Sequence, residues 1–394
     1  MKYQLSDRVN AIQPSPTLAV SQKAAELKAA GHDVIGLGVG EPDFDTPQFV
    51  KDAAKAAIDA GHTKYTAVDG IPQLKQAVIN KFQRDNGLSY EPAEILISAG
   101  GKHSIFNLLS AWLNPGDEVL IPAPYWVSYP DMSLLVGAVP RFIEAGIEQR
   151  YKITAAQLAA AITPATRLLF LNSPSNPTGT AYSKAELTAL AEVLRQHPQV
   201  LIATDDMYEH ILWTEEAFHN IAMVAPDLRD RIVILSGVSK AYAMTGWRIG
   251  YAAGPKPLIA AMKKIQSQST SNPASISQYA ALAALEGDQT CITTMVTEFK
   301  KRHDYLVAAL NTIPGMQCIA GDGTFYTFAN ITELMAQKGV STDIELCEQL
   351  LNQAKVALVP GSAFGAPGHC RFSFATSMAT LEEAVRRIDA YARS

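Results

Sequence analysis

From about residue 47 to residue 290, short apolar runs alternate with longer stretches of helical periodicity. Each run is rich in Val, Ile and Leu, and a polar turn follows it. Continuous apolar strands separated by helices are typical of a sheet covered on both faces, which means mostly parallel βαβ units. The runs that predict strands are 95–98, 119–121, 168–171, 201–203, 232–235 and 249–253.

The pattern is different on either side of this region. Residues 1–45 are irregular apart from one amphipathic stretch near 19–30, which ends at Gly31. After residue 290 the pattern predicts a long helix over 294–309, then short alternating strands such as 324–328, then more helix. We therefore expect a large domain over 47–290 and a small α+β domain over 291–394. An N-terminal arm, 1–46, is expected to pack with the small domain or with another subunit.

Composition and charge narrow the class of protein. Of the 394 residues, 48% are hydrophobic and 18% charged, below the roughly 25% charged residues usual for soluble domains, so disorder is excluded. A net charge of −5 leaves no basic surplus for nucleic acid. No apolar run approaches the roughly 20 residues that span a bilayer, and the N-terminus has no signal-peptide pattern. The four cysteines have neither CxxC nor zinc-finger spacing. We expect a cytoplasmic enzyme without a metal or a membrane partner.

Candidate chemistry follows the predicted strands. Open parallel sheets bind ligands just beyond the carboxyl ends of their strands, so these segments are expected to meet in one crevice. The segments carry a glycine pair opening a helix, an aromatic ring, an amide, a carboxylate and a lysine. They are 99–102 (Ala-Gly-Gly-Lys), 124–126 (Pro-Tyr-Trp), 172–179 with its Asn-Pro-Thr-Gly turn, 205–208 (Asp-Asp-Met-Tyr) and 236–240 (Ser-Gly-Val-Ser-Lys).

Lys240 is the predicted nucleophile. Most lysines are solvated, but this one follows a strand among small and apolar neighbours. Desolvation there lowers the pKa of an amine and frees it to form a Schiff base with a carbonyl cofactor. Arg248 either forms a structural ion pair or clamps a cofactor phosphate. The glycines before Lys102 predict an anion site at a helix N-terminus.

Asp205 allows two interpretations: a helix N-cap, or a buried carboxylate that keeps a pyridine nitrogen protonated. Tyr208 and Asn176 can donate hydrogen bonds to a ring oxygen, and Trp126 is either a core residue or a stacking plate. Arg371, in an alternating strand, is either exposed or a buried fork for a carboxylate.

A dinucleotide loop is excluded. The segment 36–40 (Gly-Leu-Gly-Val-Gly) lacks the spacing of that motif, and Glu41-Pro42 blocks a helix after it.

Taken together, these residues resemble the class I aminotransferases of fold type I, which depend on pyridoxal 5'-phosphate (PLP). The resemblance covers nearly the whole chain, from 40–47 (Gly-Glu-Pro-Asp-Phe-Asp-Thr-Pro) and 64–65 through the Asn-Pro-Thr-Gly turn to Ser239-Lys240 and Arg371. Segments 101–102, 125–130 and 243–248 are most similar to bacterial aspartate aminotransferases of the Lys-containing subgroup. The implied fold is an α/β large domain, with a mostly parallel seven-stranded sheet covered by helices, plus a smaller α+β domain.

The resemblance implies that Lys240 binds PLP covalently and later shuttles the substrate proton. Asp205 is implied to pair with the pyridine nitrogen, Tyr208 and Asn176 with the ring hydroxyl, and Trp126 with the ring face. The implied phosphate ligands are Gly101, the Lys102 backbone, Ser239, Arg248 and, across a homodimer interface, Tyr65. The implied substrate ligands are Arg371, Asn176, Trp126 and the Gly40 backbone for the α-carboxylate, and the side chains of Lys102 and Thr17 for the distal carboxylate.

The implied activity is ping-pong transfer of the amino group from L-aspartate to 2-oxoglutarate, giving oxaloacetate and L-glutamate. Prephenate, aromatic, alanine or broad specificity are alternatives, but Lys102 favours an acidic side chain. A regulatory or scaffold role is disfavoured, because no basic helix-turn-helix pattern precedes residue 40.

Three positions depart from the family pattern. Gly237 replaces a phosphate-binding hydroxyl, and Asp206 replaces the usual Glu. Gln13 replaces the Lys or Arg of several relatives that also transaminate prephenate, which weakens the case for that second activity.

Overall fold

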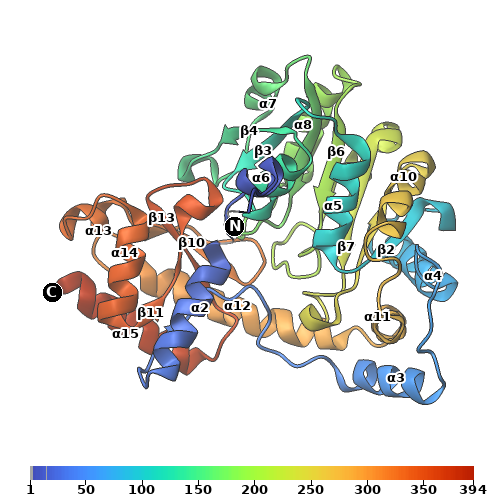
Figure 1. Ribbon diagram of the computed structural model, residues 1–394. Helices are drawn as coiled ribbons and strands as arrows, with labels where there is room; N and C mark the ends of the chain where they lie inside the picture. Colours follow the sequence, from blue (N-terminus) through green and yellow to red (C-terminus); the bar gives the residue numbers. More distant parts are fainter. Residues whose placement is uncertain (1–2, 15) are drawn as a thin grey trace.

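The computed structural model describes residues 3–14 and 16–394 and has two domains (Figure 1). The large domain is built on a seven-stranded sheet in the order β2-β8-β7-β6-β5-β3-β4. β8 is antiparallel to its neighbours, and the other neighbouring pairs are parallel. The strands are β2 (Ile95–Ser98), β3 (Glu118–Ala123), β4 (Val139–Glu144), β5 (Thr166–Asn172), β6 (Leu201–Asp205), β7 (Ile232–Gly237) and β8 (Gly250–Ala253).

All six apolar runs fall in strands of this sheet, so the predicted mostly parallel sheet is confirmed. β4 is not among the predicted strands. It lies at the edge of the sheet, where only Ile143 of its six residues is buried. An edge strand that faces solvent has no continuous apolar run to reveal it.

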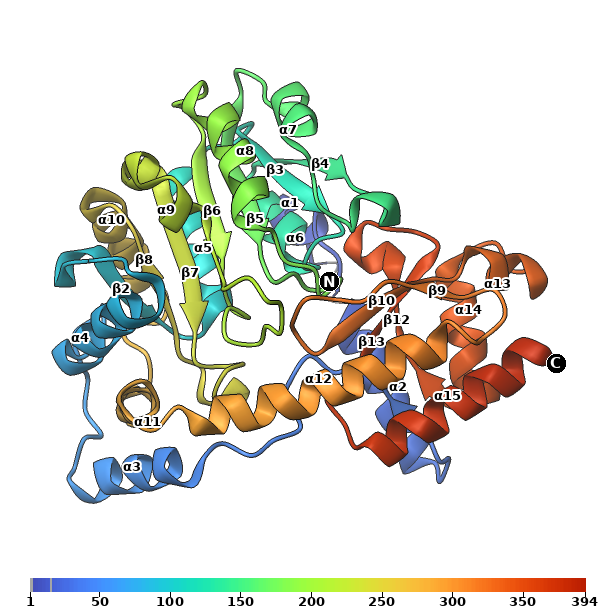
Figure 2. The same cartoon turned by 180° about the vertical axis from the view of Figure 1, so that it is seen from behind.

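Helices cover both faces of the large sheet (Figures 1 and 2). Successive residues of a strand point to opposite faces, so Leu96 packs with one layer of helices and Ile97 with the other. One layer comprises α5 (Gly101–Trp112), α6 (Ser128–Leu135) and α10 (Lys256–Ser267). The other comprises α3 (Gln48–Asp59), α4 (Pro72–Lys81), α7 (Ala155–Ala161), α8 (Lys184–Arg195), α9 (Ile221–Val224) and α11 (Ser275–Glu286).

The small domain has an antiparallel sheet in the order β12-β13-β10-β9. Its strands are β9 (Gln317–Cys318), β10 (Tyr326–Asn330), β12 (Val359–Pro360) and β13 (His369–Ser373). Its helices are α12 (Thr290–Leu310), α13 (Thr332–Gln337), α14 (Asp343–Gln349) and α15 (Met378–Arg393). α12 contains the predicted helix and extends from the small domain to the large one (Figure 2). β10 starts two residues later than predicted, because Thr324 has a φ of 67°, which cannot continue a strand.

The N-terminal arm packs mainly on the small domain through α2 (Pro16–Ala29) and β1 (Ile35–Gly36), whereas α1 (Asp7–Asn10) lies against α6 of the large domain. The helix α2 covers most of the predicted amphipathic stretch. β1 pairs in parallel with β11 (Val356–Ala357). The boundaries after residues 46 and 290 stay a prediction. Within the described residues, no helix is both long and apolar enough to cross a membrane.

Candidate active site

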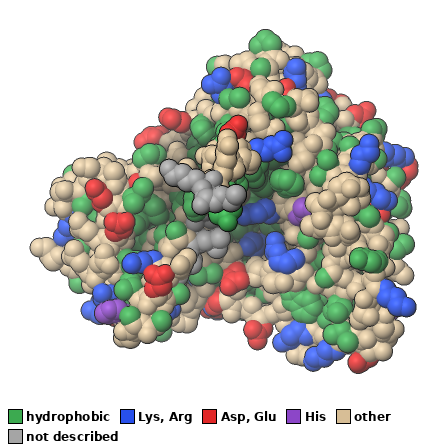
Figure 3. All heavy atoms as spheres, viewed as in Figure 1, with side chains coloured by type: hydrophobic (Ala, Val, Ile, Leu, Met, Phe, Trp, Pro, Cys, Tyr) green, Lys and Arg blue, Asp and Glu red, His purple; other side chains and the backbone are tan. Residues whose placement is uncertain are grey.

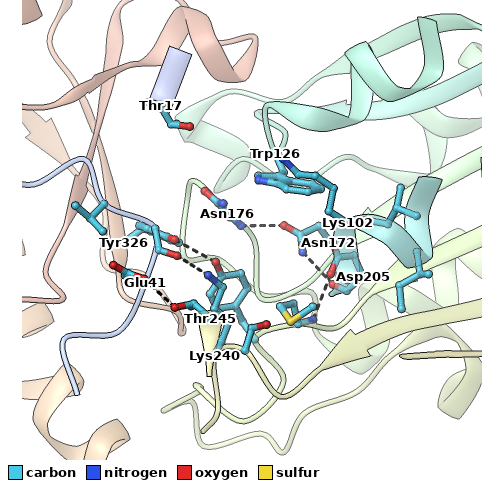
Figure 4. Close-up of a pocket in the computed structure, with 18 of the residues that line it drawn as sticks. Thr17, Glu41, Lys102, Trp126, Asn172, Asn176, Asp205, Lys240, Thr245 and Tyr326 are labelled. Atoms are coloured by element: carbon cyan, nitrogen blue, oxygen red, sulfur yellow. Dashed lines mark hydrogen bonds between the residues drawn. The ribbon is translucent and has the colours of Figure 1, made fainter. Parts of the chain in front are cut away.

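A cavity of about 560 Å³ lies where the carboxyl ends of the parallel strands face the small domain (Figure 4). Basic side chains gather in the hollow between the two domains (Figure 3). All predicted site residues except Tyr65 line the cavity. They are Thr17, Gly40, Gly101, Lys102, Trp126, Asn176, Asp205, Tyr208, Ser239, Lys240, Arg248 and Arg371.

Lys240 follows β7 and projects into the cavity. Burial, reinforced by the positive charge of Arg371, lowers the pKa of its amine to about 8. Nζ donates a hydrogen bond to the carbonyl of Gly40, which belongs to the N-terminal arm. The amine is therefore held at the junction of the two domains, and its lowered pKa favours the neutral, nucleophilic form.

Asp205 is the last residue of β6 and is buried. A turn follows it, so the N-cap interpretation is wrong. Burial raises its pKa to about 6, although a 2.6 Å hydrogen bond from the Tyr129 hydroxyl acts in the opposite direction. Tyr129, on α6, is not among the predicted site residues, because its pairing with Asp205 spans 76 positions of the chain. This carboxylate can serve a cationic ring nitrogen that enters the cavity.

Arg371 is buried on β13, so the exposed interpretation is wrong. Nη1 donates to the side-chain oxygen of Asn176 at 2.9 Å, and Nη2 donates to the carbonyl of Gly38 at 2.8 Å. Its buried Nε has no hydrogen-bond partner among the described residues. The guanidinium is thus held in place at the wall of the cavity, which fits recognition of a carboxylate.

Hydrogen bonds join the segments of Asn176 and Tyr208 to neighbouring residues. The backbone N–H of Asn176 donates to Asn172 Oδ1 at 2.9 Å, while Asn172 Nδ2 donates to the carbonyl of Asp205 at 2.9 Å. The hydroxyl of Tyr208 lies 3.1 Å from that of Tyr326. Asn172 and Tyr326 also line the cavity, and neither is a predicted site residue.

An anion cradle forms where α5 begins. Gly100 has a φ of 88°, and a Cβ there would lie 2.2 Å from Nη2 of Arg248, so only glycine lets the guanidinium pack against this turn. Backbone N–H groups at a helix N-terminus together with an arginine bind phosphate well. Gly237 is explained sterically: a Cβ there would lie 2.9 Å from the carbonyl oxygen of Ile249, which excludes a hydroxyl side chain.

Lys102 and Thr17 come from opposite domains. The ammonium of Lys102 lies 5.1 Å from the ring centroid of Trp126, and burial and the charge of Arg248 lower its pKa. Thr17, in the first turn of α2, points toward the cavity (Figure 4). Lys102 is therefore a second cationic group in the same cavity as Arg371.

Three residues named in the sequence analysis, Tyr65, Gln13 and Asp206, do not line the cavity. Tyr65 is 93% exposed in the connection between α3 and α4 and does not reach the cavity of its own chain. Gln13 is exposed, and its backbone N–H donates to Asp131 Oδ1 at 3.5 Å. Asp206 is buried beside Asp205, with hydrogen bonds from Thr204 and Asn220.

The described residues contain no cluster of His, Cys, Asp and Glu that could hold a metal ion. They do fit PLP. A lysine of lowered pKa, a buried carboxylate and a phosphate cradle share one cavity and match the aldehyde, ring nitrogen and phosphate of that coenzyme.

Residues 32–388 match the family described as "Aminotransferase class I and II", and the chain belongs to this family. It is an aminotransferase of fold type I. It is 57% identical over 390 residues to the aspartate/prephenate aminotransferase of Nitrosomonas europaea, with 98% of each chain covered. The aspartate aminotransferase of Rhizobium meliloti superposes with a TM-score of 0.96 at 48% identity, covering 100% of this chain and 99% of that one. The aspartate aminotransferase of Thermus thermophilus with maleate gives 0.92 at 42% identity, with both chains fully covered.

Proposed function

We propose that this chain is a PLP-dependent aspartate aminotransferase that transfers the amino group of L-aspartate to 2-oxoglutarate. The observation that carries the proposal is one cavity that holds a lysine of lowered pKa, a buried acid and, besides Arg248 at the phosphate cradle, two further cationic groups, Arg371 and Lys102. Two cations suit a substrate with two carboxylates. The Thermus structure carries maleate, a dicarboxylate, which supports this assignment.

The residues that would hold PLP are Lys240 at its aldehyde, Asp205 at its ring nitrogen, and Arg248 with the start of α5 at its phosphate. When bound, PLP supplies a carbonyl for the substrate amine and a ring that accepts electrons from the substrate Cα. Trp126 would stack on that ring, and Tyr208 and Asn176 would donate to its oxygen.

The protein's own groups carry out binding and proton transfer. Arg371, which lines the cavity, binds the α-carboxylate. Lys102 and Thr17 bind the distal carboxylate, which orients Cα toward Lys240. The neutral Lys240 amine would remove the proton from the substrate Cα and deliver it to the aldehyde carbon of the coenzyme. The same groups act in reverse with the 2-oxo acid.

We extend the proposal to a homodimer in which Tyr65 reaches the phosphate of the neighbouring subunit. The exposure of this large aromatic side chain supports an interface there. A cytoplasmic location stays a prediction.

The test compares aspartate, alanine and phenylalanine as amino donors for the wild type and Lys102→Gln. We expect the wild type to prefer aspartate, since a buried cation left unpaired penalises neutral substrates. Lys102→Gln should reduce kcat/KM for aspartate by about 10- to 100-fold and leave alanine within about threefold, because a hydrogen bond to a charged group is worth about 1.5–3 kcal/mol. Equal wild-type rates for the three donors would exclude a dicarboxylate preference. Lys240→Ala should abolish turnover, and full activity in that variant would refute the mechanism.

Prephenate is a second candidate substrate because a relative 57% identical is named for it. Gln13 is the residue that argues against it. Restoring a cation with Gln13→Lys should raise kcat/KM for prephenate more than for aspartate.

A further inference from the structure

Tyr326 occupies the meeting point of the two domains in the cavity. It is the first residue of β10, is 1% exposed, and comes from the small domain. Figure 4 shows its side chain directed toward the same space as Lys240 and Asn176. Its hydroxyl lies 3.1 Å from that of Tyr208, which follows β6 of the large domain. One side chain therefore touches groups that belong to different domains.

The ring of Tyr326 packs against Arg371. Phe328 pairs with Arg371 across β10 and β13, and Tyr326 lies two residues before Phe328 on the same face of the sheet. This diagonal position brings the ring centroid to 4.2 Å from Cζ of Arg371. Phe364 lies 5.0 Å from the same atom. The guanidinium is thus flanked by aromatic rings and can move little before a carboxylate arrives.

The hydroxyl of Tyr326 has a different partner. In the part of the chain that the structure describes, its one hydrogen bond joins it to the hydroxyl of Tyr208. Each phenol carries a single proton, so one of the two hydroxyls donates and the other accepts. If Tyr326 donates, the proton of Tyr208 stays available for a further acceptor in the cavity. A Cβ at Gly40 would lie 3.2 Å from the Tyr326 hydroxyl, so glycine keeps space beside this pair.

We propose that Tyr326 is a positioning residue with two separable parts. Its ring holds the Arg371 guanidinium in place for the substrate carboxylate, and its hydroxyl donates to Tyr208 so that Tyr208 donates to the ring oxygen of the coenzyme. This inference rests on the function proposed above.

Two substitutions separate the parts. Tyr326→Phe removes the hydroxyl and keeps the ring, whereas Tyr326→Leu removes both. A donor to the ring oxygen stabilises negative charge there, so weaker donation raises the pH at which the coenzyme's visible absorbance titrates. We expect Tyr326→Phe to raise this midpoint by about 0.5 pH unit, a threefold change in the equilibrium, and to leave the KM for aspartate within twofold. Tyr326→Leu should show the same spectral shift and a KM for aspartate about tenfold higher, as expected for loss of a desolvated cation–π contact.

Each part can fail by itself. An unchanged spectral midpoint in Tyr326→Phe would overturn the role of the hydroxyl. An unchanged KM for aspartate in Tyr326→Leu, or an equal rise of this KM in Tyr326→Phe, would overturn the role of the ring.

A second measurement does not depend on how Tyr326→Leu folds. It compares the spectral midpoints of Tyr208→Phe and of the double variant Tyr208→Phe/Tyr326→Phe. If the hydroxyl acts through Tyr208, the second substitution should add no further spectral shift, and an additive shift would refute it. A wild type that forms no coloured complex with PLP would refute the proposed function itself, whereas a coloured wild type with unaffected variants would refute only this inference.

Discussion

Lys81→Met should destabilise the protein far more than loss of an ion pair of equal length at the surface. Lys81 ends α4 and is fully buried; its Nζ lies 2.5 Å from Oε1 of Glu209 and donates to Asn86 Oδ1 at 2.8 Å. Burial alone would raise the pKa of Glu209, but the charge of Lys81 and the hydrogen bonds from Lys81 and Asn86 help to keep it below the ordinary value. Without Lys81, a buried carboxylate loses its closest cation.

The burial of this ion pair determines how much stability is lost. Removing one partner of a buried pair costs about 3–5 kcal/mol. At about 2 °C per kcal/mol for a domain of this size, the melting temperature should fall by about 6–10 °C. Lys300→Met is the matched control, because Lys300 also lies 2.5 Å from its carboxylate, that of Asp304, but these side chains are 41% and 53% exposed. An exposed pair contributes about 0.2–1 kcal/mol, or about 2 °C at most.

Thermal unfolding of the apoprotein, followed by circular dichroism at pH 7.5, measures these shifts. The double variant Lys81→Met/Glu209→Gln should regain most of the lost stability, since it leaves no buried charge unpaired. The reasoning is wrong if Lys81→Met melts within 2 °C of the Lys300 control, or if the double variant melts lower than either single variant. Glu209 directly follows Tyr208 of the cavity. The melting temperature of the double variant therefore also shows whether the turn at 206–210 needs the charge pair or only the packing of its side chains.

The remaining predictions concern the cavity. Because the neutral amine attacks the aldehyde and burial lowers the pKa of Lys240 to about 8, the rate at which PLP binds the apoprotein should rise with pH and level off above about 8; a rise that continues to pH 10.5 would contradict this. Tyr129→Phe removes the hydrogen bond that lowers the pKa of the carboxylate ending β6, so the acid limb of the kcat/KM profile should move to higher pH, and an unmoved limb would argue against the pairing. Gly100→Ala should weaken PLP binding at least tenfold in an equilibrium titration, because its Cβ displaces Arg248. Gly61→Ala is the control: its φ is 77° and a Cβ there meets open space, so it introduces backbone strain without displacing a side chain.

The large sheet was readable from sequence because its strands are buried on both faces and therefore form uninterrupted apolar runs. Their mutual direction was less accessible. β8 has the same apolar character as the parallel strands yet runs antiparallel to both neighbours, since residue type does not encode strand direction. β4 escaped detection for the opposite reason, because it is exposed at the edge.

The residues of the site also fall into those that the sequence predicted and those that only the structure revealed. Its strand-end residues could be listed from the sequence, because the carboxyl ends of parallel strands meet at one edge whatever the details of packing. Their partners could not. Tyr129 with Asp205, Tyr208 with Tyr326, and Lys81 with Glu209 are separated by 76, 118 and 128 positions, and no local pattern links them. Local chemistry and hydrophobic period thus determined which side chains could react, whereas the packing of two domains decided which buried groups hold them, because a desolvated donor or charge needs a partner that only the folded chain brings within hydrogen-bond distance.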